Sequence, residues 1–391
     1  MNKNYGQIKF INSSLLDFEN KENAHVFINK LIKHGIKNIH YDVMDQQFAK
    51  NSKSFSVEQI KLAYKNANSH TMDVHLMVKD PEKWIKELDF VDYISFHYEA
   101  VGATKALGLV KKYQTKDLKL GLAINPSTSF EEIKNLISHF KLILVMSVEA
   151  GAGGQAFQPE ILNKISQIKE YILQNSLDTK IMVDGGIKKE LLDKVFLSGV
   201  DFAVMGSYIL KNDDEKSLNE LNSQALKWKQ IYLAGGCFWG MQAWLKLQQG
   251  AIKTWVGYAN SDILKPSYQD LINKKSKAVE TVEFIYDSSI TSLDKILYNF
   301  LLTIDPTSLN FQANDIGLQY RNGIYWNQKK FSKHENTLIE QEILNTIKKA
   351  QENYQKPIVT EVLNLENFYL AEEYHQDYLD KNPGAYCHIK L

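Results

Sequence analysis

The sequence predicts an α/β protein in which a (β/α)₈ barrel is followed by a smaller α+β domain of the ferredoxin-like kind. The chain has 391 residues, well above the roughly 150 residues of a typical domain, so two domains are expected. Residues 7–210 alternate short apolar or β-branched runs with longer amphipathic segments, which is typical of parallel βαβ units. Beyond residue 230 this alternation stops, and strands and helices mix without a repeating order.

Eight runs in the first region are expected to be the strands of the barrel. Eight repeats in about 225 residues fit a closed barrel better than an open doubly wound sheet. No glycine-rich turn of the dinucleotide-binding kind follows the first run. The expected strands are 7–12, 39–44, 73–77, 93–96, 119–124, 142–148, 180–185 and 202–207, and the expected helices include 56–68, 102–113, 158–175 and 188–199.

The two regions join at a polar segment, residues 211–230, which is predicted to be a closing helix with apolar residues such as Leu218 and Trp228 on one face. No Pro-rich or Gly/Ser-rich linker follows it, so we expect a short, stiff junction and place the domains at 1–228 and 229–391. In the second domain the expected strands are 231–235, 252–258, 279–286 and 359–364, and the expected helices are 237–248, 291–303, 328–354 and 366–380.

Composition excludes several functional classes. Lys and Arg total 46, as do Asp and Glu, so the chain lacks the positive field of a general nucleic-acid binder. No run of 18 apolar residues and no cleavable leader is visible, which predicts a cytosolic protein with no membrane contact. Two cysteines, Cys237 and Cys387, are too few for a disulfide-stapled scaffold but enough for a catalytic redox pair.

Polar residues gather where the expected barrel strands end, which is where active sites of this fold lie. His40 and Asp42 are two apart on one strand and therefore point to the same face, while His75 and Asp184 lie on two other strands. Two imidazoles and two carboxylates form a donor set suited to one Zn²⁺, Fe²⁺ or Mn²⁺. The two aspartates also suit an acid–base pair that removes a proton α to a ketone and returns one to the opposite face.

Small residues follow the last three expected strands, and their open N–H groups predict a phosphate site of the kind common in barrels. They include Gly154, Gly186 and Ser207. A lone strand histidine is more often structural, and paired glycines are more often plain turns. Their combination at strand ends, in this order, favours a site.

The barrel region resembles the ribulose-phosphate 3-epimerase family over roughly residues 5–222. The matching segments are HYDVMD (40–45), HLMV (75–78), FHYEA (96–100), NPST (125–128), MSVEAGAGGQAF (146–157), VDGGI (183–187) and VMGS (204–207). The resemblance implies that the two histidines and two aspartates hold one divalent metal, and that the aspartates interconvert D-ribulose 5-phosphate and D-xylulose 5-phosphate at C3. It implies a reacting face lined by Met44, Met77 and Met146, and a phosphate held near Gly154, Gly186 and Ser207.

Two segments depart from that family's pattern. Ala150 and Ala152 stand where the family has Pro and Phe, which predicts weaker closure over the substrate. The first strand ends in INSSLL (11–16) in place of Pro-Ser-Ile-Leu, so either Asn12 or Ser13 is expected in the place of the serine.

In the second domain, Cys237 lies where an expected strand passes through two glycines into a helix. The unpaired N–H groups and dipole of a helix N-terminus favour the thiolate, so a reactive cysteine is predicted. The flanking Phe238 and Trp239 fit either a core or an aromatic cradle for a methyl-sulfur group.

Residues 230–391 resemble the peptide-methionine (S)-S-oxide reductase family. The matching segments are GGCFWG (235–240), VGYANS (256–261), PSY (266–268), AVE (278–280), NDIGLQYRNGIYW (314–326), FYLAEEYHQDYL (368–379) and NPGAYCHI (382–389). The resemblance implies that Cys237 is the nucleophile, that Phe238 and Trp239 hold the methyl group, and that Glu280 is the acid. It also implies that Tyr268 and Tyr320 bind the sulfoxide oxygen and that Asp315 supports the site.

Thiolate attack on a sulfoxide needs a proton donor and leaves a sulfenic acid on the cysteine. Cys387 matches a recycling cysteine of the family, which implies a disulfide with Cys237 that thioredoxin reduces; no organic cofactor is expected. The favoured hypothesis is therefore a bifunctional enzyme. The alternative is an active reductase carried on a barrel that serves only as a scaffold.

Overall fold

The structure is a computed structural model, and it describes residues 9–49, 53–115, 117–151, 155–385, 387 and 389. The chain divides into two compact units. One comprises Lys9–Ile172 and Leu177–Ala225, and the other is built mainly on Leu226–Leu391. In the described part of the chain, no helix combines the length and the apolar composition needed to cross a bilayer.

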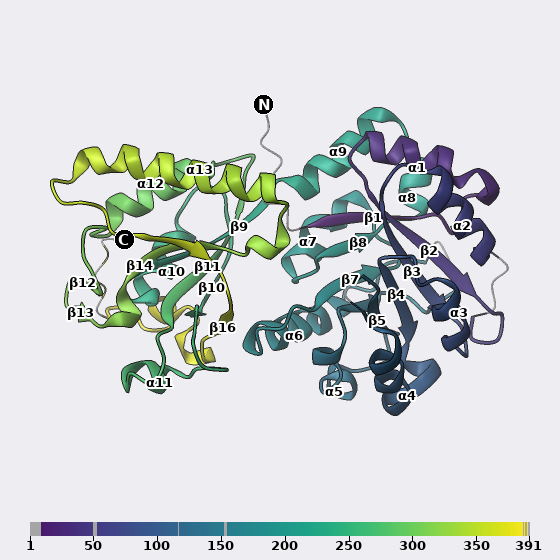
Figure 1. The fold of residues 1–391 in the computed structure, drawn as a ribbon, viewed down its shortest axis with the longest axis horizontal. Helices are drawn as coiled ribbons and strands as arrows, with labels where there is room; N and C mark the ends of the chain where they lie inside the picture. The colour runs from purple at the N-terminus through teal and green to yellow at the C-terminus, as the bar shows by residue number, and fades with distance from the viewer. Residues whose placement is uncertain are drawn as a thin grey trace. The chain divides into compact units, whose positions relative to one another are not determined.

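The first unit is a closed barrel of eight parallel strands with helices around it (Figure 1), so the predicted fold class is confirmed. The strands are β1 (Phe10–Ser14), β2 (Asn38–Met44), β3 (Thr71–Met77), β4 (Tyr93–His97), β5 (Lys119–Ile124), β6 (Leu142–Met146), β7 (Lys180–Asp184) and β8 (Phe202–Val204). The helices are α1 (Ala24–Lys33), α2 (Val57–Asn66), α3 (Glu82–Glu87), α4 (Tyr98–Tyr113), α5 (Phe130–Ile133), α6 (Ile161–Gln174), α7 (Leu192–Leu197), α8 (Ser207–Lys211) and α9 (Glu215–Leu226).

Apolar side chains from β5 to β8 fill one part of the barrel interior. Because successive strand residues alternate between the two faces of the sheet, every second residue points inward. One buried cluster of such residues comprises Ala123, Leu142, Leu144, Met146, Met182, Phe202 and Val204. This packed layer gives the strand ends a rigid base.

Two sequence-based boundaries are wrong. The first strand was expected at 7–12, but β1 reaches Ser14, because Ser13 and Ser14 continue the parallel pairing with β2. Trp228 was expected on the closing helix, but α9 ends at Leu226 and Trp228 begins the first strand of the second unit. There it pairs antiparallel with Asp287, so its place is fixed by the sheet.

The second unit contains a six-stranded sheet in the order β15-β14-β9-β11-β10-β16. Its core runs β9-α10-β10-β11-α12-β14, and these four strands lie in the order 4-1-3-2 of a ferredoxin-like fold. The elements are β9 (Trp228–Gly235), α10 (Phe238–Lys246), β10 (Ala251–Ala259), α11 (Tyr268–Ile272), β11 (Val279–Asp287), α12 (Leu293–Thr303), β12 (Phe311–Gln312), β13 (Asp315–Ile316), β14 (Asn322–Trp326), α13 (Lys333–Ala350), β15 (Glu361–Asn364), β16 (Phe368–Leu370) and α14 (Tyr378–Lys381).

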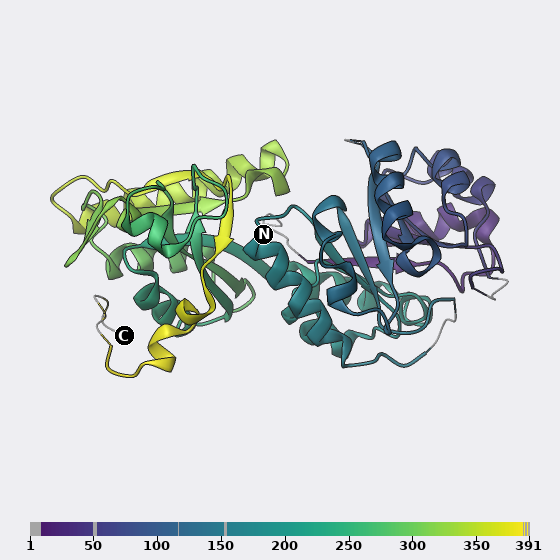
Figure 2. The ribbon, with the colours of Figure 1, turned by 90° about the horizontal axis from the view of Figure 1, so that it is seen from below.

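Helices α10, α12 and α13 share one apolar cluster with the sheet, and α12 and α13 lie side by side (Figure 1). The expected helix at 366–380 is wrong: the segment forms β16, a short 3₁₀ turn at Glu373–His375 and then α14, as the yellow stretch of Figure 2 shows. Its buried Gln376 explains the irregular path. The side-chain amide accepts the Val256 N–H at 3.0 Å and donates to the Val256 carbonyl at 2.9 Å, which ties the segment to β10.

Candidate active sites

Strand register brings the four predicted metal ligands together. The β2–β3 pairing places Asp42 beside His75, and His40 lies two residues before Asp42 on the same face. Asp184 reaches the group from the end of β7. One ligand atom from each of the four residues lies within 4.8 Å of the others. Such a group has the ligand number and types that a divalent cation binds.

The ring nitrogens that face the group support this interpretation. His40 Nε2 lies 3.4 Å from Asp42 Oδ1 and 3.8 Å from Asp184 Oδ2, and His75 Nδ1 lies 3.4 Å from Asp42 Oδ1. Within the described residues, neither nitrogen has a hydrogen-bond partner. A buried nitrogen without a partner is costly, and a cation in the group would accept both lone pairs. The residues therefore fit a divalent metal.

The opposite nitrogen of each ring is held by a neighbour. His40 Nδ1 lies 2.5 Å from Asp73 Oδ2, and His75 Nε2 lies 2.9 Å from His97 Nε2. Such outer contacts orient histidine ligands. Sequence reasoning missed Asp73 and His97, although Asp73 stands two residues before His75 and so shares its face.

On β1 it is Ser14, a residue that the sequence analysis did not single out, that contacts the metal group. The Ser14 hydroxyl donates to Asp42 Oδ2 at 2.8 Å. Asn12 directs its amide to Met182 instead, and Ser13 points to the other face of β1. The expected strand ended at residue 12, so it did not include Ser14.

The two aspartates have opposite pKa shifts. Burial alone would raise the pKa of Asp42, but the His40 and His75 rings beside it outweigh burial and hold the pKa below its ordinary value. Burial raises the pKa of Asp184 to about 7, and the negative charge of Asp42 acts in the same direction. One carboxyl is thus ionised near neutral pH while the other is available in both forms, as acid–base chemistry requires.

A cavity of about 70 Å³ is lined by Asp42, Asp184, Met77 and Met146, together with Gly186 and Ser207. Gly186 has φ +61°, and a side chain there would meet the backbone of Phe157 at 2.5 Å. Met44 packs against Met77 in a small apolar cluster. Gly154 and Ala152 lie outside the described residues.

In the second unit, Cys237 stands directly before α10, and Gly236 precedes it with φ +85°. A cavity of about 310 Å³ brings this thiol together with residues from several other elements of the unit. All of the predicted reductase residues line it: Cys237, Phe238, Trp239, Tyr268, Glu280, Asp315, Tyr320 and Cys387. Gly240, Tyr378 and Ala385 complete the wall. Residues that lie up to 150 positions apart in the sequence thus face one small space.

The electrostatics of this cavity favour a protonated acid beside a protonated thiol. Burial raises the pKa of Glu280 to about 8, and its Oε2 accepts the Phe238 N–H at 3.1 Å. Burial also raises the pKa of the Cys237 thiol, with the Glu280 carboxyl adding to it, and the helix N–H groups offset only part of this. The helix N-terminus favours the thiolate as predicted, but in the site without substrate burial outweighs it.

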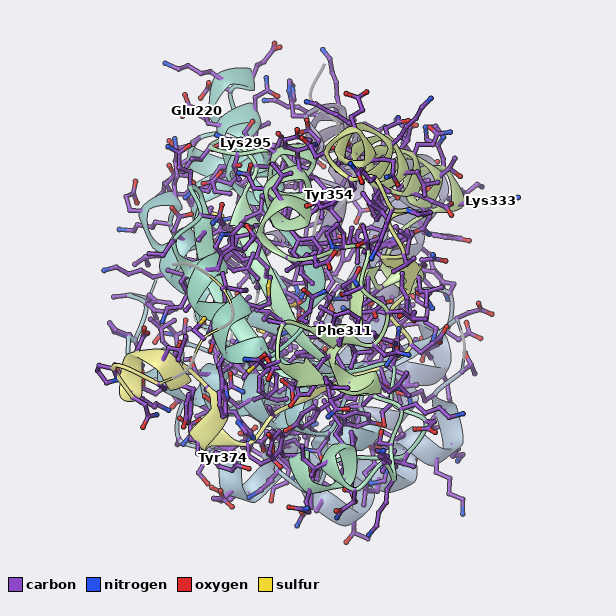
Figure 3. All side chains as sticks on the ribbon, turned by 90° about the vertical axis from the view of Figure 1, so that its left-hand side faces the viewer. Glu220, Lys295, Phe311, Lys333, Tyr354 and Tyr374 are labelled. Carbon is purple, nitrogen blue, oxygen red and sulfur yellow. The ribbon has the colours of Figure 1, made fainter. Side chains whose placement is uncertain are left out.

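An aromatic wall flanks the thiol. The Trp239 ring stacks on Tyr378 with centroids 3.7 Å apart, and its indole N–H donates to His375 Nδ1 at 3.0 Å. Tyr374 stands at the surface of the same segment (Figure 3), with its ring centroid 4.1 Å from His375. The sequence motif around these residues was visible, but no role was assigned to His375 or Tyr378.

A buried group of two histidines and two aspartates at the strand ends of a barrel is typical of an enzyme site that can hold a divalent metal. A cysteine before a helix, facing a buried acid and a second cysteine, defines a thiol-dependent oxidoreductase. The model of the ribulose-phosphate 3 epimerase family matches residues 10–210, and that of peptide methionine sulfoxide reductase matches residues 229–391. The chain belongs to both families, one in each unit.

The sequences of two methionine sulfoxide reductases support the second assignment. The peptide methionine sulfoxide reductase MsrA of Malacoplasma penetrans is 52% identical over 163 residues, which cover 42% of this chain and 97% of that protein. The MsrA of Mycoplasma pneumoniae is 49% identical over 163 residues, covering 42% of this chain and 99% of its own. Reduced Mxr1 from Saccharomyces cerevisiae is a similar solved structure, with 32% identity, a TM-score of 0.38 and coverage of 42% of this chain and 92% of its own.

Proposed function

We propose that the chain is a bifunctional enzyme with domains at 1–228 and 229–391. The barrel epimerises D-ribulose 5-phosphate and D-xylulose 5-phosphate at C3, and the second domain reduces methionine (S)-sulfoxide, free or in proteins. The observation that carries the first activity is the complete, convergent donor set of the barrel. The one that carries the second is the shared cavity of both cysteines and Glu280. We place both activities in the cytosol.

In the barrel, Asp42 and Asp184 act as the acid–base pair. One carboxylate removes the C3 proton from one face of the substrate, and the other carboxyl returns a proton to the opposite face. The chemistry that a bound Zn²⁺, Fe²⁺ or Mn²⁺ supplies is stabilisation of the negative charge that develops on the substrate oxygen. Ser14 holds Asp42 in place, and Met77 and Met146 keep water from the reacting face.

The phosphate of the substrate would bind at Gly186 and Ser207, with Gly154 as a further contact. Both described residues line the same cavity as the two aspartates. The backbone of Phe157 lies so close to Gly186 that only a glycine fits there. Because Gly186 has no side chain, its N–H group is open to a phosphate in the cavity. The phosphate and the reacting carbon of the substrate would then share this one cavity.

In the reductase, the Cys237 sulfur attacks the sulfoxide sulfur while Glu280 donates a proton to the oxygen, which Tyr268 and Tyr320 hold in place. The oxygen ends on Cys237 as a sulfenic acid and methionine leaves, so the thiol loses two electrons and the sulfoxide gains two. The thiol proton restores the Glu280 carboxyl. Asp315 supports the site, and Phe238 and Trp239 hold the methyl group.

Cys387 then closes the cycle. Its thiol attacks the sulfenic acid, water leaves, and a disulfide with Cys237 forms. An external dithiol protein of the thioredoxin type reduces this disulfide by exchange. The presence of Cys387 in the wall of the same cavity supports a direct transfer.

We expect Glu280→Gln to slow sulfenic acid formation by roughly 10²-fold or more, because an amide cannot donate the proton. In the wild type the step should depend on a protonated group with a pKa of about 8, so this dependence should vanish in the variant. Single-turnover rates of methionine release between pH 6 and 9.5 measure both effects. Glu340→Gln, on the exposed face of α13, is the matched control. A wild-type rate in Glu280→Gln would remove this residue from the mechanism.

Cys387→Ser should separate the two thiol steps. The first attack remains possible, so one equivalent of methionine should form per chain and a sulfenic acid should accumulate on Cys237. Turnover with thioredoxin should collapse, while a small thiol reductant restores part of it. The measurements are burst amplitude and steady-state rate. Unchanged turnover with thioredoxin would mean that Cys237 is recycled without an internal partner.

The alternative function, a reductase on a barrel that serves as a scaffold, is favoured only by Ala150 and Ala152 and by the altered end of the first strand. One experiment decides between them. The full chain is assayed for bound metal and for conversion of D-ribulose 5-phosphate before and after treatment with a chelator. The bifunctional proposal requires conversion that the chelator abolishes while sulfoxide reduction continues.

A further inference from the structure

Three buried or partly buried side chains form a line that ends at the metal group of the barrel. Glu99 Oε2 lies 2.9 Å from His97 Nδ1, and His97 Nε2 lies 2.9 Å from His75 Nε2. The other oxygen of Glu99 accepts the Asn125 N–H at 2.8 Å and the Thr128 hydroxyl. His97 is fully buried.

The hydrogen bonds determine which ring nitrogen of His97 and of His75 carries a proton, starting from Glu99. Burial alone would raise the pKa of Glu99. The groups that donate hydrogen bonds to its carboxylate outweigh burial and lower the pKa to about 2. Glu99 is therefore ionised and can only accept hydrogen bonds. Neutral His97 therefore carries its proton on Nδ1, which leaves a lone pair on Nε2. Because one partner of each hydrogen bond must donate, His75 must carry its proton on Nε2. The lone pair of His75 is then on Nδ1, the atom that faces Asp42.

We propose that Glu99 is a positioning residue which, through His97, selects the tautomer of His75 that can bind a metal. The inference rests on the proposed metal site. Glu99 touches neither the four ligands nor the cavity, so it acts only through its neighbour. His40 obtains the same result more directly, since Asp73 accepts from its Nδ1 and leaves the Nε2 lone pair toward the group.

Glu99→Gln tests the proposal because an amide has one oxygen. Asn125 and Thr128 both donate to the same oxygen of Glu99, so the amide oxygen belongs there and the amide NH₂ faces His97 Nδ1. The new amide NH₂ and the N–H at His97 Nδ1 are both donors and cannot pair with each other. His97 must therefore move its proton to Nε2. His75 must then move its own proton to Nδ1, where it blocks a metal.

The measurement is the Zn²⁺ affinity of the metal-free full chain, by competition with a chromophoric chelator, with the visible spectrum of bound Co²⁺ as a second signal. We expect Glu99→Gln to weaken Zn²⁺ binding by about 10- to 100-fold and to change the Co²⁺ spectrum. Glu131→Gln, which removes an exposed charge at the start of α5, should bind as the wild type does. Urea unfolding of the metal-free variants controls for stability.

His97→Phe separates tautomer selection from a charge effect. The variant leaves His75 without a selected tautomer, so it should weaken Zn²⁺ binding only a few-fold, and adding Glu99→Gln to it should cause no further loss. If Glu99→Gln weakens Zn²⁺ binding equally in the wild type and in His97→Phe, the proposal is wrong. It is also wrong if Glu99→Gln alone binds Zn²⁺ with wild-type affinity.

A test without substitutions is available if Glu99→Gln does not fold. Nitrogen-15 NMR of the metal-free wild type should show His75 protonated on Nε2 and His97 on Nδ1, and the reverse pattern overturns the inference. If the wild type binds no Zn²⁺ or Co²⁺, the metal site and the inference both fail. Metal binding with unchanged affinity in Glu99→Gln defeats the inference alone.

Discussion

Replacing Cys237 with serine is expected to abolish sulfoxide reduction. The thiol already has a raised pKa from burial, so the site depends on the nucleophilicity of sulfur and on polarisation of the substrate by Glu280. A serine hydroxyl in the same buried position ionises far less and cannot take the oxygen to form a sulfenic acid. No methionine should form, even in a single turnover with excess enzyme and with any reductant.

Two comparisons make this result specific. Conversion of D-ribulose 5-phosphate by the Cys237→Ser chain should equal that of the wild type, because the barrel forms a separate compact unit with its own cavity. The Cys387→Ser chain should still release one equivalent of methionine. Methionine release by Cys237→Ser would assign the nucleophile to another group and contradict the mechanism.

Much of both sites could be predicted from local sequence. The alternation of apolar runs fixes which face of each barrel strand is buried, so His40 and Asp42 had to point to the same side. The ends of parallel strands meet at one rim, which is why Asp184 joins them from the far end of the domain. In the reductase, motif matches alone identified residues that the fold gathers around Cys237.

The remaining features depend on tertiary structure. Ser14 was missed because the parallel pairing that extends β1 cannot be read from a single run of residues. The segment at 366–380 has a helical pattern, but hydrogen bonds between Gln376 and β10 hold it in an irregular path. The raised pKa of Cys237 reflects burial by residues distant in sequence, against which the helix N-terminus is the weaker effect.

Asp184→Asn is expected to reduce exchange of the C3 proton of the substrate with solvent by roughly 10²- to 10⁴-fold, the usual contribution of a general acid or base. Without a bound metal, burial raises the pKa of this carboxyl to about 7. A carboxyl can both give and take a proton, and an amide can do neither. The variant also loses one of the four charged or imidazole ligands of the metal group. Deuterium incorporation from D₂O and the rate of epimerisation measure the loss.

Asp178→Asn is the matched control, because it makes the same chemical change away from the site. Asp178 lies just before β7, and its side chain is 78% exposed. That variant should retain wild-type exchange and metal content. Sulfoxide reduction should continue in both variants, because the thiol cavity and the barrel cavity have no described residue in common. If Asp184→Asn binds metal and keeps wild-type exchange, a mechanism with two aspartates is wrong for this chain. If it loses metal, exchange measured at saturating metal separates the role of Asp184 as a ligand from its role in proton transfer.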